Sequence, residues 1–265
     1  MRHLTRSLAA LILALCAALP ARSETAAQKG LRIAQEASRG ETGFRDFVVE
    51  GEMVLFSARG QTSTRRFGMR TVENADDSGS RSLLIFEWPG DIRNTALLTH
   101  SFDRTADDQW LYLPAVRKVR RISGSGRSGS FVGSEFAYED MLDQNVSEFT
   151  YLWQRAEPCP NAPGPCDVVD RTPVGTSSYS VQRMWVDQRD GRVRVVQYFD
   201  RRGAHLKTLE ISGYVRHEGR YWRPNRMMMT NHLTGKRTSL DWSGHRFNQG
   251  INATEFTPNA LRNLR

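Results

Sequence analysis

A mostly β fold, built on one large and strongly curved antiparallel sheet, is the structure that this sequence predicts. Three observations lead to it. Short segments of alternating apolar and polar residues recur along the chain, joined by Gly-containing turns. One stretch near the N-terminus has helical spacing. Beyond the first residues there is no long apolar run, and 39% hydrophobic with 25% charged residues excludes both a disordered chain and a bundle of membrane helices.

The first 23 residues have the pattern of a secretory signal peptide. Arg2 and Arg6 precede an apolar run of 12 residues, 8–19, which is too short for a bilayer that needs about 20. Small residues at Ala21 and Ser23 favour cleavage after Ser23. We therefore expect residues 1–23 to be removed and residues 24–265 to form a single domain.

The charge balance is mildly basic. The chain has 37 Lys and Arg residues against 29 Asp and Glu, and without the three arginines of the signal peptide 34 basic residues remain. This excess is too small to argue for nucleic acid as a partner. It suits a transient attraction to anionic lipid head groups at a membrane surface.

Two cysteines remain after the signal peptide, Cys159 and Cys166, with three prolines and one glycine between them. Export places them in an oxidising compartment. The spacing is not that of a C-x-x-C redox motif. A disulfide that closes this small loop, contributing about 2.5 kcal/mol at most, is the prediction that we favour over a redox pair.

The pattern of secondary structure places one helix before all strands. Residues 26–39 have apolar residues at helical spacing, although Gly30 costs about 1 kcal/mol against Ala inside a helix. A Gly- and Ser-rich stretch, 123–134, and a short helical turn at 134–142 separate the two groups of strands. Strands are expected at 47–57, 64–72, 83–88, 94–103, 110–114, 116–122, 179–187, 193–199, 205–215, 221–232 and 236–247.

Motifs for catalysis or for cofactors are weak or missing from the sequence. The segment from Gly124 to Gly129 matches G-x-G-x-x-G, but no β-α-β unit surrounds it, and a mobile loop is the better interpretation. No P-loop, G-x-S-x-G elbow or H-E-x-x-H motif occurs, and the histidines are not at the spacing of metal ligands. We therefore expect no enzyme, no metal and no cofactor, with an unrecognised hydrolase as an alternative.

An acid-free basic run follows the fifth expected strand. Its members are Arg117, Lys118, Arg120, Arg121 and Arg127. A strand edge kept soluble by charge explains such a run as well as a docking site for head groups or a membrane partner does.

Large apolar residues are frequent in the strands, and most of them must form the core. A single helix, however, leaves part of a curved sheet uncovered, and an apolar cavity there would suit an acyl chain. The candidates for such a cavity are Leu84, Phe86, Trp88, Trp110, Tyr112, Met227 and Met229. We expect residues 123–134 and the following helical turn to act as a lid, with Phe131, Phe136 and Tyr138 among its functional residues.

Several segments together resemble the outer membrane lipoprotein-sorting proteins, a LolA-like family. They are Trp110-Leu-Tyr-Leu-Pro114, Arg117-Lys-Val-Arg-Arg-Ile122, Gly129-Ser-Phe-Val-Gly-Ser-Glu-Phe136, Tyr138-Glu-Asp140, Trp185-Val-Asp187, Tyr198-Phe-Asp200, Tyr214, Trp222-Arg-Pro224, Asn231 and Gly235-Lys236. The resemblance covers nearly the whole chain after the signal peptide, and the loop between the two cysteines looks like a local addition.

The resemblance implies an unclosed antiparallel half-barrel with helices over its concave face. It implies a periplasmic, non-enzymatic carrier that holds the acyl chains of a lipoprotein or lipid in an apolar cavity. An inner-membrane exporter of the RND/MMPL type is the partner that it suggests.

Two further classes of protein compete with a carrier. A periplasmic sensor or adaptor could bind a lipid or lipoprotein and regulate an inner-membrane partner. An outer-membrane β-barrel is disfavoured because many expected strands are charged on both faces.

Overall fold

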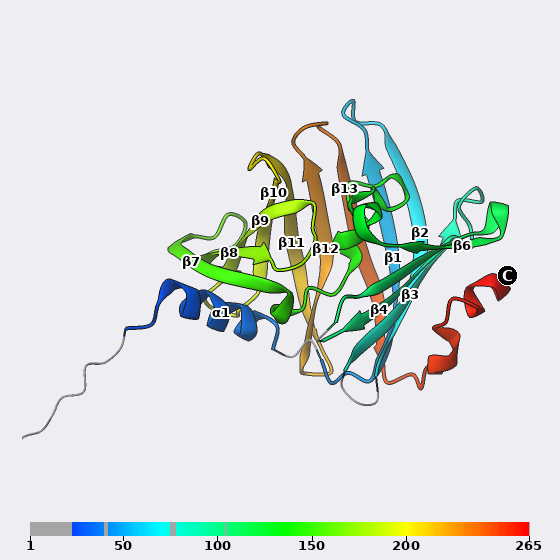
Figure 1. Ribbon diagram of the computed structural model, residues 1–265, viewed down its shortest axis with the longest axis horizontal. Coiled ribbons are helices and arrows are strands. Elements are labelled where there is room, and N and C mark those ends of the chain that lie inside the picture. The colour runs from blue at the N-terminus through cyan, green and yellow to red at the C-terminus, as the bar shows by residue number, and fades with distance from the viewer. Residues whose placement is uncertain (1–22, 40–41, 75–77, 104, 265) are drawn as a thin grey trace, which may run out of the picture.

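The computed structural model describes residues 23–39, 42–74, 78–103 and 105–264. Its strands form one antiparallel sheet of 13 strands in the order β6-β5-β4-β3-β2-β1-β13-β12-β11-β10-β9-β8-β7. The first and the last strands pair along their whole length, so β1 and β13 join the two halves of the chain. The sheet is curved, and we call the space on its concave side the hollow (Figure 1).

The elements have these bounds: α1 Ala26–Ala37, β1 Asp46–Phe56, β2 Thr62–Glu73, β3 Gly79–Trp88, β4 Ala96–Phe102, β5 Asp108–Leu113, β6 Lys118–Ile122, β7 Phe149–Pro158, β8 Pro165–Pro173, β9 Tyr179–Asp187, β10 Val193–Asp200, β11 His205–His217, β12 Tyr221–Asn231 and β13 Arg237–Phe247. Between β6 and β7 lie four short 3-10 turns, Gly124–Ser128, Phe131–Gly133, Tyr138–Met141 and Val146–Glu148. Two more, Ala253–Glu255 and Ala260–Asn263, follow β13.

The predicted fold class, an open antiparallel half-barrel, is confirmed. Strands β6 and β7 are the two edges, and no pairing joins them in the described part of the chain. The predicted helical cover takes a different form, because a segment of 3-10 turns rather than long helices lies over the hollow (Figure 1). The predicted signal peptide lies outside the described residues except for Ser23. In the described residues no helix is long and apolar enough to cross a membrane.

The helix α1 lies against strand β7, at one edge of the sheet. Thr25 begins it with a capping box, in which its hydroxyl accepts from the Gln28 N–H. The glycine at position 30 allows the helix to pack closely on β7, because a Cβ there would be 2.8 Å from the backbone nitrogen of Trp153. Ile33 and Ala34 face the core. The helix therefore protects an edge strand that would otherwise be open to pairing.

The hairpin β7–β8 was not among the predicted strands. The Cys159–Cys166 disulfide lies at its tip, and a second pairing, of β8 with β9, ties the hairpin to the sheet. Both cysteines are buried with Val168 and Trp185. The disulfide is thus confirmed, and its loop is the turn of a hairpin whose strands carry too many polar residues to stand out by alternation alone.

The two faces of the sheet have separate cores. On the concave face, side chains from nearly all strands form one large cluster, which includes Met53, Phe67 and Leu240. On the outer face of β3–β5, Leu83, Leu98 and other apolar residues form a second cluster with Phe256 and Leu261 of the C-terminal segment. Successive strand residues point to opposite faces, so both clusters draw on the same strands.

Candidate functional site

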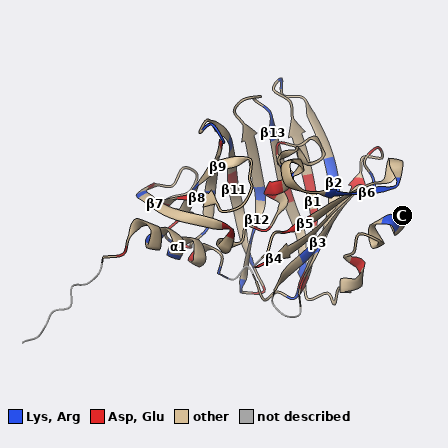
Figure 2. Cartoon of the chain, viewed as in Figure 1, with Lys and Arg blue, Asp and Glu red and all other residues tan. Residues whose placement is uncertain are grey.

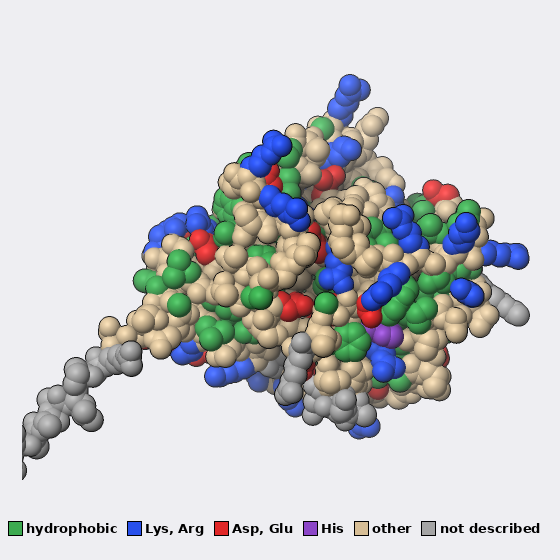
Figure 3. All heavy atoms as spheres, viewed as in Figure 1, with side chains coloured by type: hydrophobic (Ala, Val, Ile, Leu, Met, Phe, Trp, Pro, Cys, Tyr) green, Lys and Arg blue, Asp and Glu red, His purple; other side chains and the backbone are tan. Residues whose placement is uncertain are grey.

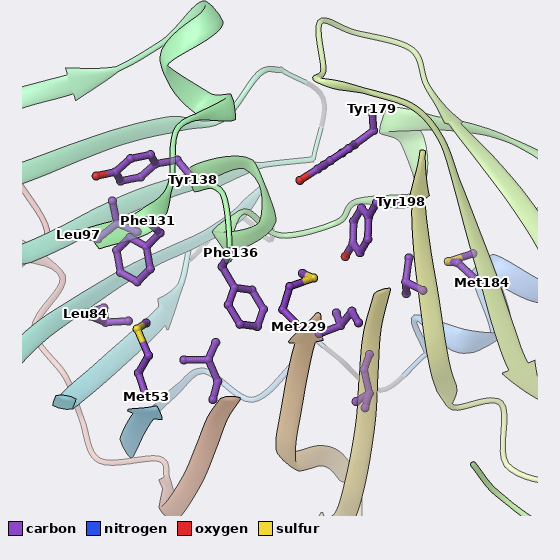
Figure 4. Packing of buried hydrophobic residues seen from close by; sticks show 14 of the residues in the cluster. Met53, Leu84, Leu97, Phe131, Phe136, Tyr138, Tyr179, Met184, Tyr198 and Met229 are labelled. Carbon is purple, nitrogen blue, oxygen red and sulfur yellow. The ribbon is translucent and has the colours of Figure 1, made fainter. Parts of the chain in front are cut away.

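A segment of irregular structure fills the hollow of the sheet. We call residues 123–142 the plug. Two of its aromatic rings, Phe131 and Phe136, are 0% and 1% exposed and belong to the concave cluster. Phe131 lies 5.8 Å from the ring of Phe86, centroid to centroid. Figure 4 shows both rings pointing into the space between Met53, Leu84 and Met229.

The backbone of the plug turns so that the two rings enter the hollow together. Val132 and Gly133 have φ angles of 49° and 76°, in the left-handed region. The turn brings the Phe131 N–H to the carbonyl of Phe136 at 2.7 Å, and Ser130 bridges to Ala137. A glycine at position 133 lowers the strain of this conformation, while Val132 bears it.

Polar contacts from distant strands hold the plug in place. The Thr238 hydroxyl of β13 accepts from the Glu135 N–H at 3.0 Å, and the Asn231 amide of β12 donates to the Glu135 carboxylate at 2.7 Å. From the other half of the sheet, Arg65 of β2 donates to the Val132 carbonyl, and Gln109 of β5 donates to the Tyr138 carbonyl at 3.1 Å.

A buried ion pair lies under the plug. The Lys207 ammonium donates to the Asp140 carboxylate at 2.5 Å, and the two side chains are 5% and 4% exposed. The Tyr179 hydroxyl donates to the second Asp140 oxygen at 2.9 Å. Burial first, and the Asp140 carboxylate second, raise the pKa of Tyr179 far above its usual range, so this hydroxyl stays a donor.

Lys207 belongs to a row of polar side chains that crosses the concave face. Strand pairing puts these residues directly opposite one another from β12 to β7, and we call them the polar row. Its members are Asn231, Lys207, Tyr198, Gln182, Arg171 and Tyr151. All but Asn231 are buried.

Two residues further along each strand, the same register gives a row that is entirely apolar. We call it the apolar row, and its members are Met229, Leu209, Val196, Met184, Val169 and Trp153. All six belong to or pack against the concave cluster. The concave face between β7 and β12 is therefore amphipathic, with polar and apolar rows side by side.

The plug contacts the polar row through two carboxylates, Glu135 on Asn231 and Asp140 on Lys207. Just after the plug, the Gln144 side chain accepts from Arg171 at 2.9 Å. Arg171 donates in addition to Gln182 at 2.6 and 2.8 Å, and it has no ion pair with any described residue. Burial lowers the pKa of Arg171.

A cleft of about 290 Å³ opens beside the plug, at the ends of β4 and β5. Apolar side chains form most of its wall, with Tyr138 and Val132 contributed by the plug. The lining residues are Asp91, Ile92, Thr95, Leu111, Leu113, Pro114, Ala115, Ser130, Val132 and Tyr138. Its volume is at the lower end for a small-molecule site.

Two carboxyl groups, those of Asp107 and Glu148, lie near the segment that leads from the plug to β7. Burial raises the pKa of Glu148 to about 7 and that of Asp107 to about 6. The Asp107 carboxylate adds to the shift of Glu148, and the Asp143 carboxylate adds to that of Asp107. Asp107 accepts from the Phe102 N–H at 2.9 Å, and Arg127 donates to the Asp107 carbonyl.

The predicted cavity residues divide between the two faces. Leu84, Phe86, Met227 and Met229 lie in or against the concave cluster. Trp110 and Tyr112 belong to the cluster on the outer face, because at β5 it is Leu111 that points inward. Trp88 is 45% exposed near the cation of Arg66. The hollow is thus lined without these last three residues.

The predicted lid and docking residues also divide. Phe131, Phe136 and Tyr138 fill the hollow, and Arg127 contacts the loop before β5. Arg117, Lys118, Arg120 and Arg121 are exposed along β6, where Arg121 pairs with Asp108. Lys and Arg are spread over many strands, and on the surface they gather where β6 lies (Figures 2 and 3).

The sequence analysis missed the polar row. One local signal was available, since Lys207 alternates with Leu209 and Ile211, at positions where a strand points inward. The partners of Lys207 on five other strands depend on register, which no local pattern reports.

The histidines also pair in space, His205 with His232 and His217 with His245, with ring centroids 4.3 and 4.6 Å apart.

Comparisons with known proteins show what this chain is similar to. A family model described as an uncharacterized protein matches residues 78–263. A crystal structure described as an outer membrane lipoprotein-sorting protein domain, from Vibrio parahaemolyticus, is 39% identical, has a TM-score of 0.84, and aligns over 89% of this chain and 99% of that one. No curated protein matches.

Two further solved structures are similar over the same length. A DUF1329 family protein from Desulfovibrio piger is 29% identical with a TM-score of 0.83, over 89% of this chain and 99% of that one. A LolA superfamily protein from Nitrosomonas europaea is 20% identical with a TM-score of 0.68, over 88% and 98%. The last likeness concerns the fold alone.

Proposed function

This chain belongs to the outer membrane lipoprotein-sorting protein family, and we propose that it works as a periplasmic, non-enzymatic carrier of acyl chains. Its cargo would be a lipoprotein or a lipid, moved between the inner and outer membranes. An inner-membrane exporter of the RND/MMPL type would be its partner.

The observation that carries the proposal is the way in which the hollow is filled. Phe131 and Phe136 occupy it from a segment without regular helix or strand, while the sheet around them is complete without that segment. If the plug moves out, an apolar surface that includes Leu84, Phe86 and Met229 becomes free for an acyl chain. Methionine side chains suit cargo of variable shape.

The energetics favour such an exchange. Burial of one CH₂ contributes about 0.8 kcal/mol, so a chain of about 14 carbons contributes on the order of 10 kcal/mol before ordering costs. Two phenylalanine rings that leave the hollow give up about 3–6 kcal/mol of burial. A long acyl chain therefore competes with the plug without any covalent step.

Native mass spectrometry tests the proposal. The protein is taken from the periplasm without detergent, measured, and measured again after solvent extraction. We expect an added mass that extracts as a lipid or an acylated peptide. A protein that carries no extractable mass, and that binds no acyl chain when one is offered, would favour the sensor or adaptor instead.

The basic strand β6 has a place in the same proposal. Its exposed cations would meet head groups or the exporter at the membrane surface. Replacing Arg117, Lys118, Arg120 and Arg121 by Ser should slow transfer of an acyl probe to anionic vesicles several-fold and leave the melting temperature nearly unchanged. Equal transfer rates for the variant and the natural protein would remove β6 from the function.

A further inference from the structure

The underside of the plug imitates an anionic ligand. Its carboxylates, on Glu135 and Asp140, bind two donors of the polar row, Asn231 and Lys207. Gln144 supplies an amide oxygen to a third donor, Arg171. The plug and the residue Gln144 just after it thus place acceptor oxygens against a line of buried donors, where water does not compete.

The polar row carries more positive than negative charge. Lys207 and Arg171 are both buried. Asp140 from the plug is the carboxylate paired with Lys207, and Arg171 has no ion pair with any described residue. The other carboxylates of the plug accept from neutral donors, Glu135 from Asn231 and Glu139 from the hydroxyls of Ser177 and Ser178. An acyl chain that replaces the plug keeps water from the same place, and because a buried charge without a partner is costly, an anion on the cargo would compensate Lys207 and Arg171.

We propose that the polar row is a binding site for the phosphate of an anionic amphiphile, with Lys207 and Arg171 as its cations. Asp140 occupies the position of the phosphate at Lys207 while the plug is in place. The inference rests on the proposed function, since the plug must leave the hollow, and it narrows the cargo to lipids with a negatively charged head group.

The geometry of the two rows fits one amphiphile. Lys207 offers three N–H donors and Arg171 five in a planar fork, a set that matches the oxygens of a phosphate. The Tyr179 hydroxyl and the Gln182 amide lie beside them. Two residues along the same strands, Leu209, Val196 and Met184 provide the apolar surface for the chain. Figure 4 shows Met229, Tyr198 and Met184 on one side of the view, with Phe136 next to Met229.

The test uses two lipids that differ in the phosphate alone. They are 1-lauroyl-glycerol and 1-lauroyl-glycerol 3-phosphate, titrated below their aggregation limits into the full mature chain at pH 7, with inorganic phosphate as a third probe. We expect the phosphate lipid to bind about tenfold more tightly, the worth of one charge-assisted hydrogen bond.

Two variants assign the preference to the polar row. Asp140→Asn removes the competing carboxylate, so the preference for the phosphate lipid should rise by about another tenfold. Lys207→Met with Asp140→Asn removes both charges of the buried pair and leaves Arg171 as the one cation of the site. This double variant should lose most of the preference that Asp140→Asn shows while still binding the neutral lipid. Lys236→Met, which removes an exposed cation of the β12–β13 turn, is the control and should keep the natural ratio. Circular dichroism and melting curves check that each variant is folded.

Each outcome decides a separate point. Equal binding of both lipids by the natural chain and by Asp140→Asn would overturn the anion site and leave the carrier intact. A preference that is undiminished in the double variant would place the phosphate away from Lys207 and overturn it too. If inorganic phosphate binds as tightly as the phosphate lipid, the polar row is a site for free phosphate, and the proposal that its ligand is an amphiphile is wrong. Failure of both lipids to bind would contradict the carrier itself.

Discussion

Two irregular segments cover the same sheet, one on each face, and they are held differently. The plug fills the concave face, and the tail, residues 248–264, covers part of the outer face (Figure 1). Each inserts two large apolar side chains that are 1% exposed or less, Phe131 and Phe136 from the plug and Phe256 and Leu261 from the tail. In this pair of fully buried apolar side chains the two segments are alike.

Their polar contacts separate them. The ion pair of the plug, Lys207 with Asp140, is buried, whereas that of the tail, Arg70 with Glu255, is exposed on both sides. A cleft opens beside the plug, and no residue of the tail lines it. The backbone N–H groups of Gln249 and Gly250 in the tail donate to the Asp46 carboxylate, and the Phe256 carbonyl contacts His100. The comparison teaches that the side-chain ion pair of the plug is a contact that an anionic ligand can replace, whereas the backbone contacts of the tail offer no such exchange.

The largest expected effect comes from removing one ring from each segment. Phe256→Ala and Phe136→Ala should each lower the free energy of unfolding by about 3–5 kcal/mol, since both rings are fully buried. They should differ in binding, because the space left by Phe136 lies in the hollow. Only Phe136→Ala should bind 1-lauroyl-glycerol more tightly, by several-fold. Tighter binding by Phe256→Ala would place the cargo on the outer face and reverse the comparison.

The two ion pairs give the next effect. Lys207→Met leaves Asp140 buried without its cation, and we expect a loss of about 3 kcal/mol, at the lower end for a broken buried pair because Tyr179 still donates to Asp140. Arg70→Gln should cost about 0.5 kcal/mol or less, as for most exposed pairs. Chemical denaturation of both variants measures the difference. Similar losses for the two would show that burial does not distinguish the plug from the tail.

The smallest effect is a dependence on pH. The pKa of Glu148 is raised from about 4.5 to about 7 by burial first and by Asp107 second, so the folded state binds this proton more tightly than the unfolded state does. The stability from this group is present below pH 4.5 and is lost as the pH rises through 7.

A neutral amide at this position should remove the loss. Glu148→Gln is expected to raise the free energy of unfolding at pH 8 by on the order of 1 kcal/mol and to change little at pH 4. Glu255→Gln in the tail, where the carboxylate is exposed, is the matched control. Melting curves between pH 4 and 8 measure both, and a gain for Glu148→Gln that is equal at both ends would contradict the raised pKa.

The fold followed from the sequence to a large extent. The helix, the strands before and after the Gly- and Ser-rich stretch, the disulfide and the open curved sheet are all in the structure. The hairpin β7–β8 was missed because polar residues interrupt its alternation. Among the cavity residues, Leu84 and Phe86 face the hollow, but Trp110 and Tyr112 do not, since a shift by one residue exchanges the two faces of a strand.

The sequence by itself determined what local physical chemistry can encode: periodicity that makes strands, glycines that make turns, a Thr cap that begins the helix, and a basic run on an edge strand. Only the tertiary structure decided which residues meet. The pairing of β1 with β13 joins the two halves of the sheet, although the two strands lie at opposite ends of the chain. The register of six strands aligns Lys207 with Arg171 and Leu209 with Met184. Such contacts join residues far apart in sequence, and their energy exists only once the whole sheet has formed.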